Sequence, residues 1–277
     1  MNRVLENPFF KELSRFLFIL DRHNIFILSS SLAYYATLAL APFLLVLFQL
    51  APLIGLDHQR RLIRQISYTI SPQVADVVNL IVDNADKAID TSSLMGIVGT
   101  VLILFTSSVA FLHLRYSFNL IYGFYDPERQ RRLMEIIKDR LISMLFVVVF
   151  NIGFVASLFL TSYFFYHMRT RGITGLGASL MLTSFNFIVF FGLFFCLYYF
   201  VPSKKVSWSV LIRSSIYASV GFLIGKILFG IYFKNIVSTS VYGAAGALLV
   251  FLIWTYYSAL IVFFSAELAN YLKIRKS

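Results

Sequence analysis

The sequence is constrained most by an apolar stretch at residues 25–56, which is too long and carries too little charge for the core helix of a soluble protein. A straight helix of that length would measure about 48 Å, whereas the hydrocarbon core of a bilayer is about 30 Å thick. Charged residues make up only 13% of the 277 residues, against about 25% in soluble domains. We therefore expect an integral membrane protein whose first span tilts, bends or projects beyond one face.

Polar residues and prolines interrupt this first span, and they are Ser29, Ser30, Ser31, Tyr34, Tyr35, Thr37, Pro42, Gln49 and Pro52. Polar groups at this depth cost free energy unless they face protein or water. Pro42 removes one backbone hydrogen bond, which predicts a kink. Two interpretations remain open. The span either lines a polar cavity, or it packs among other helices with its hydroxyls bonded to its own backbone.

Five more apolar segments follow and predict an all-α, polytopic membrane protein with six transmembrane helices in one membrane-embedded domain, residues 1–277. The predicted spans are residues 25–56, 94–122, 141–166, 178–201, 208–233 and 243–268. Apolar residues at helical spacing in 8–20 predict an N-terminal interfacial helix within a cytoplasmic amphipathic segment, residues 1–24. An apolar stripe opposite acidic positions in 57–93 predicts an extracytoplasmic helical hairpin that caps one mouth of the bundle.

The basic residues are divided unequally between the two sides that six spans define. The termini and the 123–140 and 202–213 loops carry fifteen lysines and arginines, whereas the opposite loops carry seven. Because cytoplasmic loops are enriched in basic residues, both termini are predicted to be cytoplasmic. The net charge of +11 is explained by basic loops at an anionic leaflet. We therefore expect anionic membrane lipids as partners and no nucleic acid.

Motifs for common enzyme chemistry are missing. The four histidines are isolated in sequence, there is one cysteine, and there is no zinc-protease helix motif, phosphate-binding loop, dinucleotide-binding glycine pattern or nucleophile elbow. We expect no catalytic residue, no metal and no cofactor, so the chain is predicted not to be an enzyme and to have no ATPase of its own.

Ionisable residues inside the spans are the strongest functional signal. Lys226 lies thirteen residues beyond Arg213, about 20 Å along the helix, where a lysine costs about 2.5–3.5 kcal/mol. It extends its amine to the headgroups, stays neutral, or faces a wet, anion-tolerant cavity. Glu267 lies at a different depth and is not expected to pair with it. Arg115 and Glu267 approach the cytoplasmic face, where a structural pair is expected. With Arg140 they are the candidate charges of the cytoplasmic mouth.

Aromatic and small residues complete the set of candidates. Trp254 lies eleven residues past Gly243, deeper than the interfacial belt that holds most membrane tryptophans. Gly243, Gly246 and Ala247 form a small-residue patch that permits close helix contact. The predicted substrate path comprises Tyr34, Tyr35, Pro42, Lys226, Trp254 and Tyr256.

Four stretches carry a resemblance to a known family: SLAYYATLALAPFLLVL (31–47), KDRL (138–141), LYYFVPSKKVSW (197–208) and YGAAGALLVFLIWTYYSALIVFFSAELANYL (242–272). Together they make the chain resemble the YihY/BrkB family, although Ser265 stands where the family usually has glycine before Ala266 and Glu267. The resemblance implies a multi-pass protein of the bacterial inner membrane with six helices. Family labels include ribonuclease BN, generally regarded as a misassignment, virulence or serum-resistance factor, and transporter of lipids or small anions.

Three functional hypotheses follow. The first is a transporter or flippase that moves an anionic lipid or small anion through a polar intramembrane cavity. The second is a non-transporting scaffold that recruits envelope-assembly partners through the 57–93 hairpin or the basic 129–140 helix. The third, a membrane-bound nuclease, ranks last. A second copy of the chain or an envelope protein is the expected protein partner.

Overall fold

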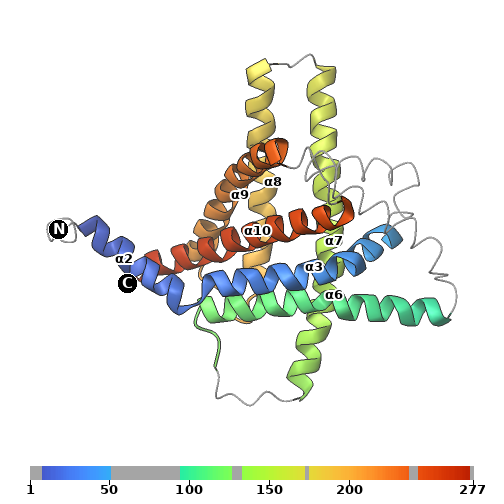
Figure 1. Cartoon of the computed structure of the whole chain (residues 1–277), viewed down its shortest axis with the longest axis horizontal. Coiled ribbons are helices and arrows are strands. Elements are labelled where there is room, and N and C mark those ends of the chain that lie inside the picture. The colour runs from blue at the N-terminus through green and yellow to red at the C-terminus, as the bar shows by residue number, and fades with distance from the viewer. Residues whose placement is uncertain (1–7, 51–93, 127–132, 172–174, 237–242, 275–277) are drawn as a thin grey trace.

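The structure is a computed structural model that describes residues 8–50, 94–126, 133–171, 175–236 and 243–274 (Figure 1). Within these ranges all regular secondary structure is helical. The helices are α2 (Pro8–Arg22), α3 (Ile25–Leu50), α6 (Leu94–Ile121), α7 (Leu133–Thr170), α8 (Gly175–Phe200), α9 (Trp208–Ile236) and α10 (Gly243–Ile274). The all-helical prediction is confirmed for this part of the chain. The predicted hairpin at 57–93 lies outside the described residues.

The first apolar span is preceded by a sharp bend. Asn24 adopts a φ of 51°, a left-handed conformation that asparagine tolerates better than most residues. The apolar parts of α2 and α3 meet there at 45°, so α2, the predicted interfacial helix, and α3 are two separate helices. Helix α3 continues through Pro42 to Leu50, and Figure 1 shows its C-terminal part turning away from α6.

Five helices pack side by side in the order α6, α3, α10, α9 and α8. Helix α3 packs along α6 and α10, α10 packs along α9, and α9 packs along α8, whereas α7 contacts mainly α6. Figure 1 shows α7 crossing α6 near the middle of that helix. At 38 residues, α7 is about 57 Å long. It joins the basic segment before residue 141 to the predicted third span without a break.

The apolar core gathers where the α2–α3 bend meets the C-terminal ends of α6 and α10. Phe118 of α6 is completely buried, and its ring lies 5.3 Å from that of Tyr198 and 5.7 Å from that of Phe263. Phe16 and Ile25, on the two sides of the bend, belong to the same cluster. Burial of these large side chains therefore fixes one end of the helical arrangement.

Among the described residues, three helices contain segments long and apolar enough to cross a membrane: Leu180–Phe200, Trp208–Phe229 and Leu249–Ile274. The bent pair Ser14–Arg22 and Ile25–Ala39 adds a fourth if it is counted as one span. The segments in α8, α9 and α10 each overlap a predicted span. The bent pair overlaps the predicted first span only in its second helix, because its first helix lies in the segment that was predicted to be interfacial. The count of six stays a prediction.

Helices α9 and α10 approach closely at two glycines. A methyl group at Gly225 would lie 2.5 Å from Cε1 of Tyr257, and one at Gly221 would lie 2.9 Å from Cγ2 of Ile261. The spacing of four residues puts both glycines on one face, as in close transmembrane helix pairs. The small-residue patch predicted from the sequence lies at Gly243 instead, and the surroundings of that patch lie outside the described side chains.

Candidate functional site

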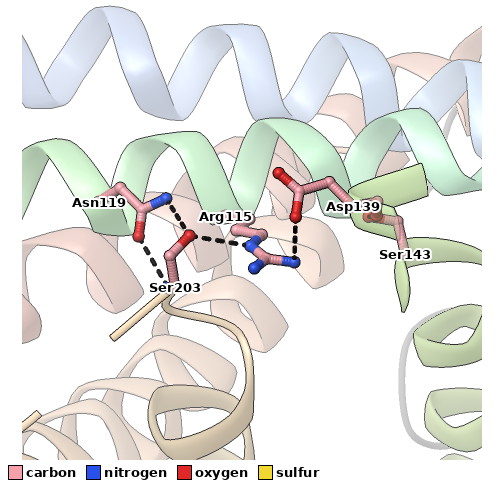
Figure 2. A network of polar contacts seen from close by, with 5 residues as sticks. All are labelled: Arg115, Asn119, Asp139, Ser143 and Ser203. Atoms are coloured by element: carbon pink, nitrogen blue, oxygen red, sulfur yellow. Dashed lines mark hydrogen bonds and ion pairs between the residues drawn. The ribbon is translucent and has the colours of Figure 1, made fainter. Parts of the chain in front are cut away.

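A polar network joins three elements at one end of α6 (Figure 2). Nη1 of Arg115 lies 3.2 Å from Oδ1 of Asp139 on α7. Its Nε donates to the hydroxyl of Ser203, in the turn between α8 and α9, at 3.1 Å. Asn119 donates to the same hydroxyl at 2.7 Å and accepts the Ser203 backbone N–H at 2.9 Å. Ser143 donates to the Asp139 carbonyl at 2.8 Å. The guanidinium of Arg115 is therefore neutralised and held in place.

Asn119 also ends α6. Its carbonyl accepts the N–H groups of Phe124 and Tyr125 at 2.7 and 3.0 Å, and Gly123, the residue before them, has a φ of 69°. A glycine in this left-handed conformation is the usual device that terminates a helix and satisfies its last carbonyls. One residue thus closes α6 and attaches it to the α8–α9 turn.

A second set of polar contacts holds the C-terminal part of α10. Glu267 is buried, with 2% of its surface exposed, and its Oε2 lies 2.8 Å from Nδ1 of His23 in the α2–α3 bend. Asn270 donates to the carbonyl of Ile121 at 3.1 Å, and Tyr271 donates to a carboxylate oxygen of Glu12 at 2.7 Å. These contacts tie α10 to α2 and α6.

Arg115 and Glu267, which were predicted to pair with each other, have other partners. Arg115 pairs with Asp139, and Glu267 pairs with His23. In the sequence His23 stood only as an isolated histidine, and Asp139 had no predicted role. Sequence spacing could not have predicted these partners, because they lie far apart along the chain; His23 and Glu267, for example, are 244 positions apart.

Arg140, the third mouth charge, lies apart from the other two. Its Nη2 donates to the carbonyl of Phe105 at 2.8 Å, and its guanidinium carbon lies 3.7 Å from the centre of the Phe105 ring. Phe105 is ten residues before Arg115 on α6, about 15 Å along the helix. Arg140 therefore contacts the middle of α6.

The polar residues of α3 divide into two groups. The hydroxyls of Ser29, Ser30 and Thr37 donate to carbonyls of their own helix at 2.7 to 3.0 Å, which favours the packed-helix interpretation for these three. Tyr34 is 56% exposed. Its ring lies 5.6 Å from that of Tyr35, which in turn lies 5.1 Å from the ring of His113 on α6.

This ring contact continues along α6. Nε2 of His113 lies 3.2 Å from the carbonyl of Leu28, so that nitrogen donates its hydrogen across to α3. The His113 ring lies 6.3 Å from that of Tyr116, and Tyr116 lies 5.1 Å from Tyr125. Tyr34, Tyr35, His113, Tyr116 and Tyr125 thus form a continuous aromatic and polar series, here called the tyrosine–histidine series, across α3, α6 and the turn that follows.

Lys226 lies on α9 beside a cluster of aromatic rings. It is half-buried, and no residue in the described ranges forms a hydrogen bond or ion pair with its amine. Phe222 and Phe229, four residues before and three after it, share its face of the helix. Both rings pack against Trp254 of α10, with centres 5.4 and 4.8 Å away.

The predicted substrate path thus occupies two places. Tyr34 and Tyr35 lie on the α3–α6 pair, and Lys226, Trp254 and Tyr256 lie on the α9–α10 pair. Across the described residues, no hydrogen bond or ring contact joins the two groups, and the side chain of Pro42 is not among those described. Convergence of the path residues on one cavity stays a prediction.

A shallow groove lies between α2 and α10, lined by Glu12, Ser14, Arg15, Phe18, Ile19, Tyr271 and Ile274. None of the predicted path residues lines it.

The histidine, cysteine and acidic side chains bear on metal binding. Within the described ranges, no group of three or more histidine, cysteine, aspartate or glutamate side chains could hold a metal ion.

Comparison with known proteins identifies relatives along nearly the whole chain. A UPF0761 membrane protein of Psychrobacter sp. is 27% identical over 250 residues, which cover 89% of this chain and 45% of the relative. One from Janthinobacterium sp. is 26% identical over 281 residues, 97% of this chain and 63% of the relative. One from Actinobacillus pleuropneumoniae is 24% identical over 257 residues, 91% of this chain and 90% of the relative.

The chain spans about half the length of the first of these curated relatives. A Bacillus subtilis protein named as ribonuclease-like is 31% identical over 84 residues, 30% of each chain. No solved structure matches. The family described as Virulence factor BrkB matches residues 19–277. This chain therefore belongs to the YihY/BrkB family of membrane proteins.

Proposed function

We propose that the protein moves an anionic lipid or a small anion across the bacterial inner membrane, without catalysing a chemical step and without an ATPase of its own. The observation that carries this proposal is Lys226. It is a half-buried cation in a segment long enough to span the membrane, and no described residue supplies a counter-ion. A cation in that position costs free energy, which an anionic substrate would offset whenever it passes.

The surroundings of Lys226 support a substrate more than a purely structural role. The aromatic rings of Phe222, Phe229 and Trp254 gather on the face of α9 that carries the lysine. Aromatic rings provide apolar contact for an acyl chain and tolerate a cation nearby. The competing account is a lysine whose apolar stem packs among these rings while its amine reaches the headgroups. In that case the amine would have no effect on transport.

The test is transport by the purified protein in liposomes, with Lys226→Ala as the variant. One assay follows a fluorescent phosphatidylglycerol analogue between leaflets, and another follows chloride with an internal dye. We expect Lys226→Ala to slow transport about tenfold or more, the scale of one lost charged contact. Lys204→Ala, in the exposed α8–α9 turn, is the matched control and is expected to transport normally.

Two results would refute the proposal. One is that the wild-type protein moves neither the lipid nor the anion. The other is that Lys226→Ala transports at the wild-type rate while inserting normally, because the amine would then have no part in the path.

One observation favours the scaffold as a second candidate. The first turns of α7 expose large apolar side chains, with Leu133 79% and Met134 76% exposed, and Figure 1 shows this end of α7 projecting beyond the other helices. Such a surface suits contact with another membrane protein. A scaffold would lose function in cells when Leu133 and Met134 are replaced by serine, whereas Lys226→Ala would have no effect.

A further inference from the structure

Two arginines lie where α7 meets α6, and their surroundings differ. Arg115 has a carboxylate partner, Asp139, and a hydroxyl partner, Ser203 (Figure 2). Arg140, the residue that follows Asp139, has one hydrogen bond, to the carbonyl of Phe105. Across the ranges that the structure describes, no carboxylate lies within ion-pair distance of Arg140. Within the described ranges its positive charge is therefore uncompensated, because the adjacent aspartate pairs with Arg115.

The guanidinium of Arg140 is held in place, but most of its N–H donors form no hydrogen bond with the described residues. An arginine has five N–H donors, and the contact with Phe105 uses one of them. The Nε–H is buried and has no hydrogen-bond partner among the described residues. The Phe105 ring lies 3.7 Å from the guanidinium carbon, so a cation–π contact restrains the group. A buried donor without a partner requires an explanation, and an absent ion is one of the ordinary explanations.

We propose that Arg140 binds a phosphate oxyanion at the crossing of α6 and α7. A restrained guanidinium presents its donors in a fork that matches two oxygens of one phosphate, which lysine cannot do. The phosphate belongs either to a lipid headgroup or to free phosphate. As a site for a transported substrate, this inference rests on the function proposed above. As a phosphate-binding site, it stands separately.

The location suits a ligand that arrives along α6. Phe105 is 48% exposed, so the Arg140–Phe105 pair is accessible from outside the helix bundle. Tyr116 is eleven residues from Phe105, close to three full turns, so both lie on the same face of α6. Tyr116, a member of the tyrosine–histidine series, therefore lies on the side of α6 that carries the Phe105 ring and offers a hydroxyl toward the end of the helix.

The simpler explanation is that Arg140 only ties α7 to α6 through the Phe105 carbonyl. The two explanations differ in one respect. A tether stabilises the protein equally with or without phosphate, whereas a binding residue also determines how much stability phosphate adds, since a ligand of the folded state raises the melting temperature by mass action.

The experiment measures the melting temperature of the full-length protein in detergent against added probes. Phosphatidylglycerol is compared with diacylglycerol, which lacks the phosphate, and sodium phosphate is compared with sodium chloride at equal ionic strength. We expect phosphatidylglycerol, sodium phosphate or both to stabilise the wild type more than their controls do. In Arg140→Gln the apparent affinity should fall about tenfold or more, and Arg140→Lys should retain an intermediate affinity. Arg171→Gln, at the opposite end of α7, is the control and should bind as the wild type does.

Each outcome decides the proposal. Stabilisation by phosphatidylglycerol alone identifies a lipid headgroup, and stabilisation by inorganic phosphate as well identifies the phosphate group itself. If neither probe stabilises the wild type, or if Arg140→Gln lowers the melting temperature but leaves the phosphate-induced increase unchanged, the proposal is overturned. Binding that depends on Arg140 in a protein that transports nothing would refute the proposed function and leave this site in place.

Discussion

At the scale of single residues, the contact between His23 and Glu267 shows how the α2–α3 bend is attached to α10. Glu267 has 2% of its surface exposed, and the imidazole of His23 is its side-chain partner at 2.8 Å. A buried carboxylate without a partner carries a large desolvation cost. His23 reaches Glu267 because the chain bends 45° at the adjoining break between α2 and α3.

The contact predicts a measurable coupling between the two residues. His23→Ala removes the partner of a buried carboxylate and should lower the free energy of unfolding by about 1–3 kcal/mol. Glu267→Gln removes the charge that His23 compensates. The double variant should therefore lose less stability than the sum of the two single variants. Denaturant unfolding in detergent measures all three, and strictly additive losses would contradict a direct contact.

The sequence identified three of the charged residues in these contacts but not their partners. Arg115, Arg140 and Glu267 were selected because charges near or within spans are costly, and that reasoning needs no structure. Their contacts depend on the bend at Asn24 and on where α7 crosses α6. These features arise from tertiary packing, on which local sequence patterns carry no information.

At the scale of helices, the starts were more predictable than the packing. Helices α3, α6, α9 and α10 begin at Ile25, Leu94, Trp208 and Gly243, the positions expected from the change between polar and apolar sequence. The close approach of α9 and α10 was not anticipated. Hydropathy shows that both helices are apolar on all sides, so it does not distinguish the face that contacts a neighbour.

The α9–α10 contact predicts that Gly225→Ala is destabilising. In a helix this change ordinarily adds up to about 1 kcal/mol of stability. Here the new methyl group would lie 2.5 Å from the Tyr257 ring, and relieving such a clash costs about 1–3 kcal/mol. Gly192→Ala on α8 is the matched control, since a methyl group there would meet no neighbouring side chain or helix within 4 Å. Thermal unfolding should show a lower midpoint for Gly225→Ala only, and an unchanged midpoint would contradict the close contact.

At the scale of the whole molecule, segments that the charge distribution assigns to one side of the membrane contact one another. Ser203 in the α8–α9 turn contacts Asn119 near the end of α6. His23 before α3 contacts Glu267 near the end of α10. Such contacts are expected if these segments share one face of the bilayer. The substrate route was less predictable, because Tyr34 and Lys226 lie on different helix pairs and only packing decides which polar residues meet.

The last prediction tests the orientation of α8, which joins two exposed basic residues, Arg171 and Lys205. The excess of basic residues predicts that Lys205 is cytoplasmic and Arg171 is outside. Cys196 is the single cysteine, so Cys196→Ser permits one new thiol at either position. A membrane-impermeant maleimide applied to intact spheroplasts should label Arg171→Cys at once and Lys205→Cys only after permeabilisation. Labelling of both in intact spheroplasts would show that α8 does not cross, and the reverse pattern would invert the whole protein and place the α8–α9 turn outside.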